Sequence, residues 1–296
     1  MTQFVELLIS GASVGFVYAL VALGFVMIFR ATRVVNFAHG SLVLLGAYVI
    51  ARTHGSLGFV PAVLIGVVGT ALVGVLVQAL ILRRLRGATL DIATIATIGV
   101  DILLATELTR RIGTRSLDIG DPWRDHVVHL GSFLVPEARV AAAVVAIVLL
   151  SAFFAAFKLS GWGVAMRCAA EDGEAAALMG IRLGRVAAGA WVVAGALAAV
   201  GGVFFTTFPT PGVDSSVGLS ALIALPAAIL GGLDSLAGAV VGGLILGVVV
   251  TLTAGYQNDL SFLGRGLGDV APYIVMVLVL LFRPAGLFGT RELTRV

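Results

Sequence analysis

Long apolar runs constrain this chain more than any other feature of its sequence. Several exceed the roughly 20 residues that a helix needs to cross a bilayer, and none alternates apolar with polar residues as a membrane β-barrel does. Bundled helices satisfy their own backbone in lipid. Because 59% of the 296 residues are hydrophobic and only 12% are charged, a soluble domain with a polar surface is excluded. We therefore predict an all-α, polytopic transmembrane helical bundle that forms one domain over residues 1–296.

The apolar residues fall into nine segments, of which eight or nine cross the membrane. Their ranges are 6–29, 37–51, 60–82, 88–109, 138–157, 186–208, 218–230, 236–255 and 268–282. Two of them, 37–51 and 218–230, are shorter than a straight span requires, so we predict tilted or broken helices there. Residues that let a backbone unwind flank these two segments: Asn36, His39 and Gly40 at one, and Gly212, Asp214, Pro226 and Gly231 at the other. Interrupted segments in the two halves of a membrane chain indicate a substrate path.

Basic residues indicate the orientation of the chain in the membrane. Four clusters lie between the apolar segments, namely Arg30 and Arg33; Arg83, Arg84 and Arg86; the segment from Lys158 to Arg185; and Arg283, Arg291 and Arg295. With nine crossings and the N-terminus outside, all four clusters and the C-terminus are cytoplasmic. The longest external loop, 110–137, is mixed in charge. The net charge of +3 therefore reports orientation rather than a surface for nucleic acid.

The first apolar segment is predicted to remain in the protein as a membrane anchor. It has no basic stretch before it, it is preceded by Glu6, and it is followed by Arg30 and Arg33. A cleaved signal peptide has the opposite arrangement of charge.

The loop 159–185 is the longest polar stretch on the cytoplasmic side. Val164, Cys168, Ala175 and Leu178 fall within one helical arc, so the loop is predicted to form a short amphipathic helix. Charged residues lie elsewhere on its surface: Arg167, Glu171, Asp172 and Glu174. Helices that lie on a membrane surface are usually more basic and more aromatic. The composition favours docking against another protein.

Glycines recur at four-residue spacing in the segment 236–255. The pairs are Gly238 with Gly242 and Gly243 with Gly247, and Gly11 with Gly15 repeats the pattern near the N-terminus. Small residues at this spacing let two helices approach closely. We interpret the four glycines as a helix-packing face rather than as a gate.

Ionisable side chains at membrane depth are costly, and they are often functional. Asp101 lies ten residues from Asp91, or roughly 15 Å along a helix, which places it near the middle of the membrane. It is either a proton site of a secondary transporter or a carboxylate bonded to a neighbouring helix or to water. Glu107 and Arg110 are three residues apart and are predicted to form a local ion pair. His39 is the third candidate of this kind.

The sequence contains no machinery for hydrolysis. Lys158 is the only lysine, and it does not lie in a phosphate-binding loop of the G-x-x-x-x-G-K-[ST] type. Cys168 is the only cysteine, and the four histidines lack the spacing of a metal site. We expect no catalytic residue, no metal and no cofactor on this chain.

Four runs of residues resemble one known family. They are Val35 to Gly40, Glu174 to Gly180, Gly231 to Gly238 and Phe282 to Gly289. Together they resemble the membrane permease subunits of branched-chain amino acid ABC importers, over nearly the whole chain. The resemblance implies a protein of the bacterial inner membrane that works with a second permease, homologous or identical, with two cytoplasmic ATPases that bind ATP and Mg²⁺, and with an external substrate-binding protein.

The resemblance also assigns roles to individual residues. Glu174, Ala175 and Gly180 match the E-A-A-x-x-x-G pattern of the coupling loop, and with Arg167 and Glu171 they are the candidate contacts to an ATPase. The isoleucine and the leucine-proline pair of the longer importer pattern are missing after Gly180. Asn36, His39, Gly40 and Asp101 are the candidates for the substrate pathway, although Asp101 stands where an apolar or small polar residue is expected.

Three interpretations of the function follow from the sequence. The first is an ABC permease for branched-chain amino acids, or for another small solute such as urea or an amide. The second is a proton-coupled secondary carrier that uses Asp101. The third is a membrane scaffold or receptor subunit without transport.

Overall fold

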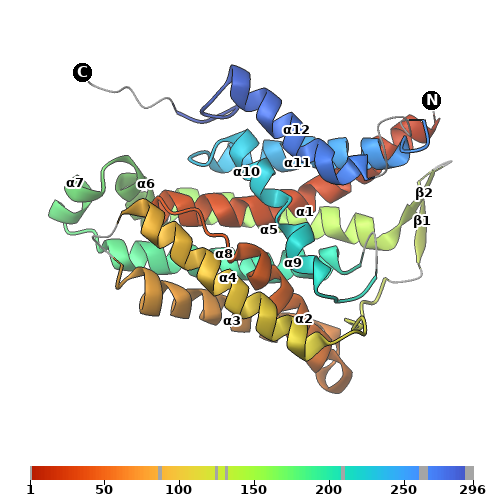
Figure 1. Cartoon of the computed structure of the whole chain (residues 1–296), viewed down its shortest axis with the longest axis horizontal. Coiled ribbons are helices and arrows are strands. Elements are labelled where there is room, and N and C mark those ends of the chain that lie inside the picture. The colour runs from red at the N-terminus through yellow and green to blue at the C-terminus, as the bar shows by residue number, and fades with distance from the viewer. Residues whose placement is uncertain are drawn as a thin grey trace.

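The computed structural model describes residues 2–85, 89–123, 126–130, 133–207, 211–259 and 266–290. The long helices are α1 (Thr2–Thr32), α2 (His39–Leu57), α3 (Phe59–Val77), α4 (Leu90–Ile112), α5 (Glu137–Leu159), α8 (Leu183–Phe205), α11 (Leu236–Gly255) and α12 (Leu267–Phe282). The short ones are the π-helix η1 (Gln78–Leu82), α6 (Gly161–Glu171), α7 (Gly173–Leu178), α9 (Ser216–Ala221) and α10 (Ala224–Gly231). The long helices run roughly side by side and form a bundle (Figure 1).

Helix α1 lies at the centre of the bundle. It is apolar on every side, as a helix surrounded by lipid or by other helices is. Residues Ala19 to Ile28 are almost fully buried, and α1 contacts α5, α8, α10 and α11. The N-terminal segment is therefore the core of the fold rather than a peripheral anchor.

Six helices of the described chain are long and apolar enough to span a membrane. They are α1, the continuous unit of α3 and η1, α4, α5, α8 and α11, and the shorter apolar helices are the α9–α10 unit and α12. The prediction of a polytopic helical bundle is confirmed, and the chain is a multi-pass membrane protein.

The two short apolar segments differ in structure. The segment 218–230 is broken into α9 and α10, as expected. The segment 37–51, in contrast, is part of one continuous helix, α2, which extends through Arg52, Thr53 and His54 to Leu57. Polar residues can continue a helix as well as apolar ones, so hydropathy placed the end of this segment too early. The irregular backbone lies before the helix, at residues 33–38.

The loop 110–137 contains a short β-hairpin that an all-α prediction did not include. Strands β1 (Val127–Leu130) and β2 (Phe133–Pro136) pair antiparallel, with Val127 opposite Pro136. Leu117 and Val213 exchange two backbone hydrogen bonds of 3.0 and 2.7 Å, which tie this loop to the segment before α9. Arg124 and Asp125, which contributed to the predicted mixed charge, lie outside the described residues.

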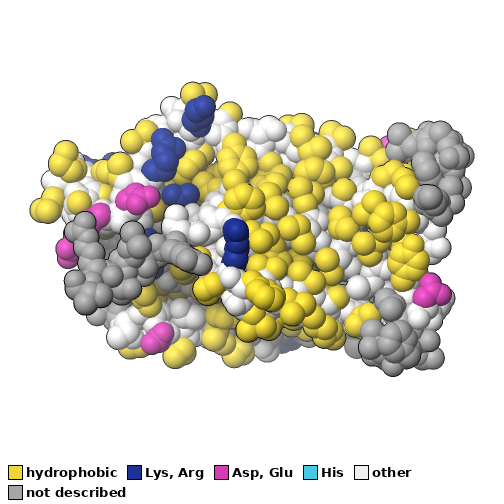
Figure 2. Space-filling model, turned by 90° about the horizontal axis from the view of Figure 1, so that it is seen from above, with side chains coloured by type: hydrophobic (Ala, Val, Ile, Leu, Met, Phe, Trp, Pro, Cys, Tyr) yellow, Lys and Arg dark blue, Asp and Glu magenta, His cyan; other side chains and the backbone are white. Residues whose placement is uncertain are grey.

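The basic clusters share one end of the bundle. The C-terminal end of α1, η1, the short helices α6 and α7, and the end of α12 lie there, whereas α1 begins at the opposite end, near the β-hairpin (Figure 1). Apolar side chains cover most of the middle of the face in Figure 2, and charged ones gather mainly toward the α6–α7 end. Arg86, Arg291 and Arg295 lie outside the described residues. This end, called the basic end below, matches the side predicted to be cytoplasmic.

Candidate functional site

The loop 159–185 forms two short helices at the basic end instead of one. The hydroxyl of Ser160 accepts a hydrogen bond of 3.1 Å from the Gly163 amide and caps α6, and the carboxylate of Asp172 accepts one of 2.9 Å from the Ala175 amide and caps α7. An N-cap residue has a non-helical backbone, so Asp172 ends the first helix as it begins the second. Because its short carboxylate can cap a helix, Asp172 is the signal from which the break could have been predicted.

Helix α7 ends in a turn that requires glycine. Gly180 has φ of +86°, and the amides of Gly180 and Ile181 bond to the carbonyls of Ala177 and Ala176 at 3.0 Å each. This left-handed C-terminal geometry is typical of glycine. Glu174, Ala175 and Gly180 are all exposed, and so are Leu178 and Met179, at 88% and 84% of their surface. Two large apolar side chains thus project into solvent at the tip.

The predicted amphipathic arc does not pack against the bundle. Val164, Cys168 and Leu178 are exposed, whereas Met166 and Ala176 are buried. The arc was expected to face another protein, and within this chain it is left uncovered.

Helix α6 is tied firmly to the bundle. The Arg167 guanidinium donates a hydrogen bond of 2.9 Å to the Phe157 carbonyl and lies 5.3 Å from the centre of the Phe157 ring. Trp162 packs over Gly189 of α8, where a Cβ would lie on the indole. Arg33, at the end of α1, donates a 2.6 Å hydrogen bond to the Ala170 carbonyl. These contacts connect α6 directly to α5, α8 and the end of α1.

Replacing Arg167 with methionine is expected to loosen this attachment. The change keeps the length of the side chain but removes a charged hydrogen bond and a cation–π contact, together about 2 kcal/mol. Hydrogen exchange of the α6 amides should accelerate about thirtyfold, which mass spectrometry of the purified protein measures. Lys158→Met is the control, because Lys158 is exposed and the substitution removes one positive charge from the same end of the bundle. Equal exchange in the two variants would contradict the assignment.

Asn36 and His39 lie in the turn between α1 and α2, and both are fully buried. The Asn36 side-chain oxygen accepts a 3.2 Å hydrogen bond from the Ala38 amide, whereas its Nδ2 has no partner among the described residues. The His39 ring lies against Gly24 and 4.5 Å from the centre of the Phe25 ring. Within the part of the chain that the structure describes, neither ring nitrogen makes a hydrogen bond of ordinary geometry, although the Val21 backbone lies close enough to interact. Both residues shape the turn from within.

Asp101 is bonded to a neighbouring helix. The buried Ser41 hydroxyl of α2 donates to the Asp101 carboxylate at 2.5 Å and also lies 3.3 Å from its backbone carbonyl. One turn earlier on α4, the Thr97 hydroxyl accepts a 3.1 Å hydrogen bond from the Phe37 amide. Of the two readings of Asp101, this geometry supports the carboxylate bonded to a neighbouring helix.

The structure brings only some of the pathway candidates together. Gly40, next to Ser41, lies so close to α9 that a Cβ would be 2.5 Å from the Gly218 carbonyl oxygen. Gly40 and Asp101 therefore border the contacts of α2 with α9 and α4, while His39 faces α1. The sequence did not predict the contacts that Ser41, Thr97 and Arg33 make, because single hydroxyls and an arginine at a helix end have no distinctive spacing.

The predicted ion pair near the end of α4 is confirmed. Glu107 lies 2.8 Å from Arg110, and it also pairs with Arg111 at 2.5 Å. All three side chains are largely exposed, so the pairs contribute little to stability.

The four glycines of α11 lie at its contacts with α1 and α10. A Cβ on Gly243 would lie 2.5 Å from the Ala19 amide nitrogen, and Gly247 faces Gly15 of the same helix, α1. Gly238 and Gly242 face the backbone of Gly231 and Ala227 of α10. The backbones approach so closely that no side chain fits between them.

Two of the shared sequence runs pack against each other. The amides of Leu287 and Phe288 donate hydrogen bonds of 2.8 and 3.0 Å to the carbonyls of Leu230 and Gly231, at the end of α10. The Thr290 amide donates one of 2.9 Å to the Asp234 carboxylate. Gly286, with φ of +82°, lies against the backbone of Gly232, and Gly232, with φ of +105°, lies against the backbone of Gly289. The C-terminal run thus caps α10.

The chain was compared with known proteins. The family model described as "Branched-chain amino acid transport system / permease component" matches residues 7–280. The high-affinity branched-chain amino acid transport system permease protein LivH of Escherichia coli strain K12 is 30% identical, over 99% of this chain and 98% of its own length. BraD of Pseudomonas aeruginosa has the same identity and coverage, and a probable LivH of Methanocaldococcus jannaschii is 30% identical over 91% of this chain and 88% of its own. No solved structure matches.

Proposed function

The chain belongs to the permease component family of branched-chain amino acid transport systems, and from this premise we propose that it carries branched-chain amino acids inward as the membrane subunit of an ABC importer. It serves as a transport subunit and hydrolyses nothing itself. ATP and Mg²⁺ bind to two separate ATPase subunits on the cytoplasmic side of the bacterial inner membrane. An external binding protein delivers the substrate.

The observation that carries this proposal is the construction of α6 and α7. Their tip is exposed, with Leu178, Met179 and Glu174 free to contact another protein, while their base is tied to three long helices. Such an element can transmit the movement of a partner to the bundle. ATP favours one arrangement of the two ATPases, and their movement shifts the bundle between its inward- and outward-open states.

The substrate pathway is proposed to lie between two permeases rather than inside one. Asn36, His39, Gly40 and Asp101 line neither the cavity between η1 and the start of α8 nor the one beside Arg30 and Asp234. Asp101 is partly exposed on α4, in a face where Ile98, Ile102 and Leu103 are also exposed. A second permease, either another copy or a homologue, covers this face and completes the pathway.

Reconstitution tests the proposal. The complex is purified in mild detergent, its subunits are identified by mass spectrometry, and uptake of labelled leucine into proteoliposomes is measured with and without ATP. We expect two ATPase polypeptides and a second permease, and uptake that requires ATP. Uptake by this chain alone without ATP would overturn the proposal. Uptake of urea or an amide but not of leucine would support an ABC importer with a different substrate.

Replacing Asp101 with asparagine is expected to leave uptake within about threefold of the wild type. The asparagine oxygen still accepts the Ser41 hydrogen bond, so the contact between α2 and α4 remains. Asp101→Leu should lower stability by about 1 kcal/mol, because the Ser41 hydroxyl then loses the carboxylate and keeps only the longer contact with the backbone carbonyl of residue 101. Uptake with and without an uncoupler is the measurement. Loss of uptake in Asp101→Asn together with sensitivity to the uncoupler would favour a proton-coupled carrier.

A further inference from the structure

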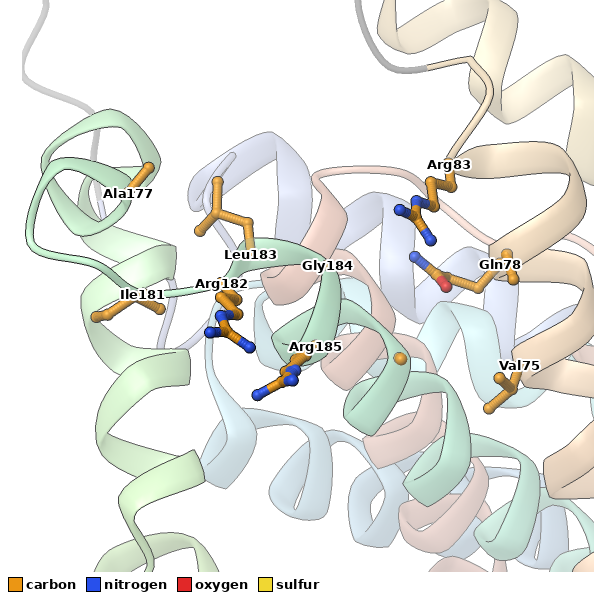
Figure 3. A pocket seen from close by; sticks show the side chains of 11 residues that line it. Val75, Gln78, Arg83, Ala177, Ile181, Arg182, Leu183, Gly184 and Arg185 are labelled. Carbon is orange, nitrogen blue, oxygen red and sulfur yellow. The ribbon is translucent and has the colours of Figure 1, made fainter.

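A cavity of about 630 Å³ opens at the basic end, between η1 and the start of α8. One wall consists of Val75, Gln78, Ala79 and Arg83, and the other of residues 181–185 with Ala177 and Ala188. Figure 3 shows Arg83 and Gln78 on one side of this space and Arg182 and Arg185 on the other. The two walls come from segments about a hundred positions apart in the sequence.

The cavity is positively charged, and no side chain of the described chain neutralises it. Arg83, Arg182 and Arg185 line it, and no aspartate or glutamate does. Within the ranges that the structure describes, none of these guanidinium groups forms a hydrogen bond or an ion pair with a side chain. Three like charges around one space repel one another unless an anion lies between them. The arrangement therefore calls for a negatively charged group.

Neutral donors point to the same kind of ligand. Helix α8 begins at this cavity, and the amides of Leu183 and Gly184 in its first turn have no backbone acceptor in the described chain. Free amides at a helix N-terminus favour an anion. Gln78 is only 4% exposed, and its side chain points into the cavity in Figure 3. The side-chain amide of Gln78 has no hydrogen-bond partner in the described chain. Its π-helical turn belongs to a class of distortion that is common at functional sites.

An apolar surface leads from the cavity along α3 into the membrane-spanning region. Leu72, Leu76 and Leu80 are exposed at four-residue spacing and form one stripe on α3 and η1. Val75 and Ala79, beside this stripe, line the cavity itself. A ligand that combines an anionic head with long apolar chains fits both features at once.

We propose that this cavity binds the phosphate group of an anionic phospholipid, with the acyl chains along the leucine stripe of α3. Arginine suits phosphate because its planar group donates two parallel hydrogen bonds. Free phosphate would leave the leucine stripe unused. A soluble protein partner at the basic end, such as an ATPase, would leave the stripe unused as well, because the stripe runs along a membrane span. The proposal requires only that the chain spans a membrane and does not depend on the substrate.

Lipid retention tests the proposal. The complex is placed in bilayers containing phosphatidylglycerol and phosphatidylcholine, released into detergent, and its bound lipid is measured by native mass spectrometry. Wild type should retain phosphatidylglycerol. Arg182→Gln with Arg185→Gln should bind it about thirtyfold more weakly, and Arg83→Gln on the other wall about fivefold. The matched control is Arg84→Gln, which removes an exposed arginine that does not line the cavity and should have no effect.

Several results would overturn the proposal. They are absence of phosphatidylglycerol from the wild type, equal retention in all variants, and equal retention of phosphatidylcholine. Binding of added inorganic phosphate without any lipid would assign the cavity to a free anion. If the variants keep the lipid but lose the co-purifying ATPase polypeptides, the cavity would be assigned to a protein partner. If the double variant does not fold, comparing phosphatidylglycerol retention between Arg83→Gln and Arg84→Gln still tests the proposal.

Discussion

Glu174→Arg is expected to abolish ATP-driven uptake while the permease still folds and enters the membrane. Glu174 lies in the first turn of α7, it is exposed, and it has no ion pair within the described chain. An arginine there opposes the helix dipole by only about 0.5 kcal/mol, which is too little to unfold the protein. In a contact with an ATPase, reversing a charge costs several kcal/mol and suppresses binding. The loss should therefore appear in coupling and not in stability.

Gly180→Leu should produce the same phenotype for a different reason. A leucine at φ of +86° is strained by about 1–2 kcal/mol, so the turn after α7 will rearrange and Leu178 and Met179 will move. Uptake, ATPase activity and co-purification of the ATPases measure the result. Glu6→Arg makes the same charge change on an exposed residue of α1, and Gly55→Leu puts leucine where no atom lies within 4 Å. Both controls should transport normally, and normal uptake by Glu174→Arg and Gly180→Leu would refute the coupling role.

Gly243→Ala should destabilise the bundle by about 2 kcal/mol. The new methyl group would lie 2.5 Å from the amide nitrogen of Ala19 and 2.6 Å from its Cα. Backbone cannot move aside as a side chain can, so α11 must separate from α1 along their whole contact. An apparent melting temperature about 5 °C lower is expected for the purified protein in detergent.

The matched control for this substitution is Gly69→Ala. Gly69 lies within α3, and a Cβ there would meet no atom within 4 Å. Alanine in a helix interior is favoured over glycine by about 0.5–1 kcal/mol, so this variant should be as stable as the wild type or slightly more so. A similar loss of stability in both variants would show that the Gly243 contact is not responsible.

Hydropathy was enough to predict a bundle of apolar helices, because burial in lipid selects residue by residue for apolar side chains. It failed at the end of α2, where Arg52, Thr53 and His54 continue the helix beyond the apolar run. It also could not predict the β-hairpin, because strands of four residues leave too little periodicity to detect. Glycine spacing was informative for α11, since contacts between backbones allow few other residues.

The candidate site was less predictable than the spans. The pattern from Glu174 to Gly180 located α7, and the helix-capping residue type of Asp172 was the one sign, not used in the prediction, that the loop divides into two helices. The attachment of the loop depends on Arg33, which lies 137 residues from its partner Ala170. The bond between Ser41 and Asp101 joins residues 60 positions apart. A single sequence contains no pattern that reports such distant pairs, because each residue type is common and its partner is fixed only by the packing of the helices.

The contact between the C-terminal run and α10 sets an order for the synthesis of this membrane protein. The carbonyls of Leu230 and Gly231 accept hydrogen bonds from Leu287 and Phe288, which the ribosome adds more than fifty residues later. Until then the carbonyls at the end of α10 lack these amide donors, and carbonyls without donors are unfavourable away from water. A nascent chain can therefore insert its earlier helices but cannot close this corner of the bundle. Closure of this corner therefore has to wait until translation has passed the last helix.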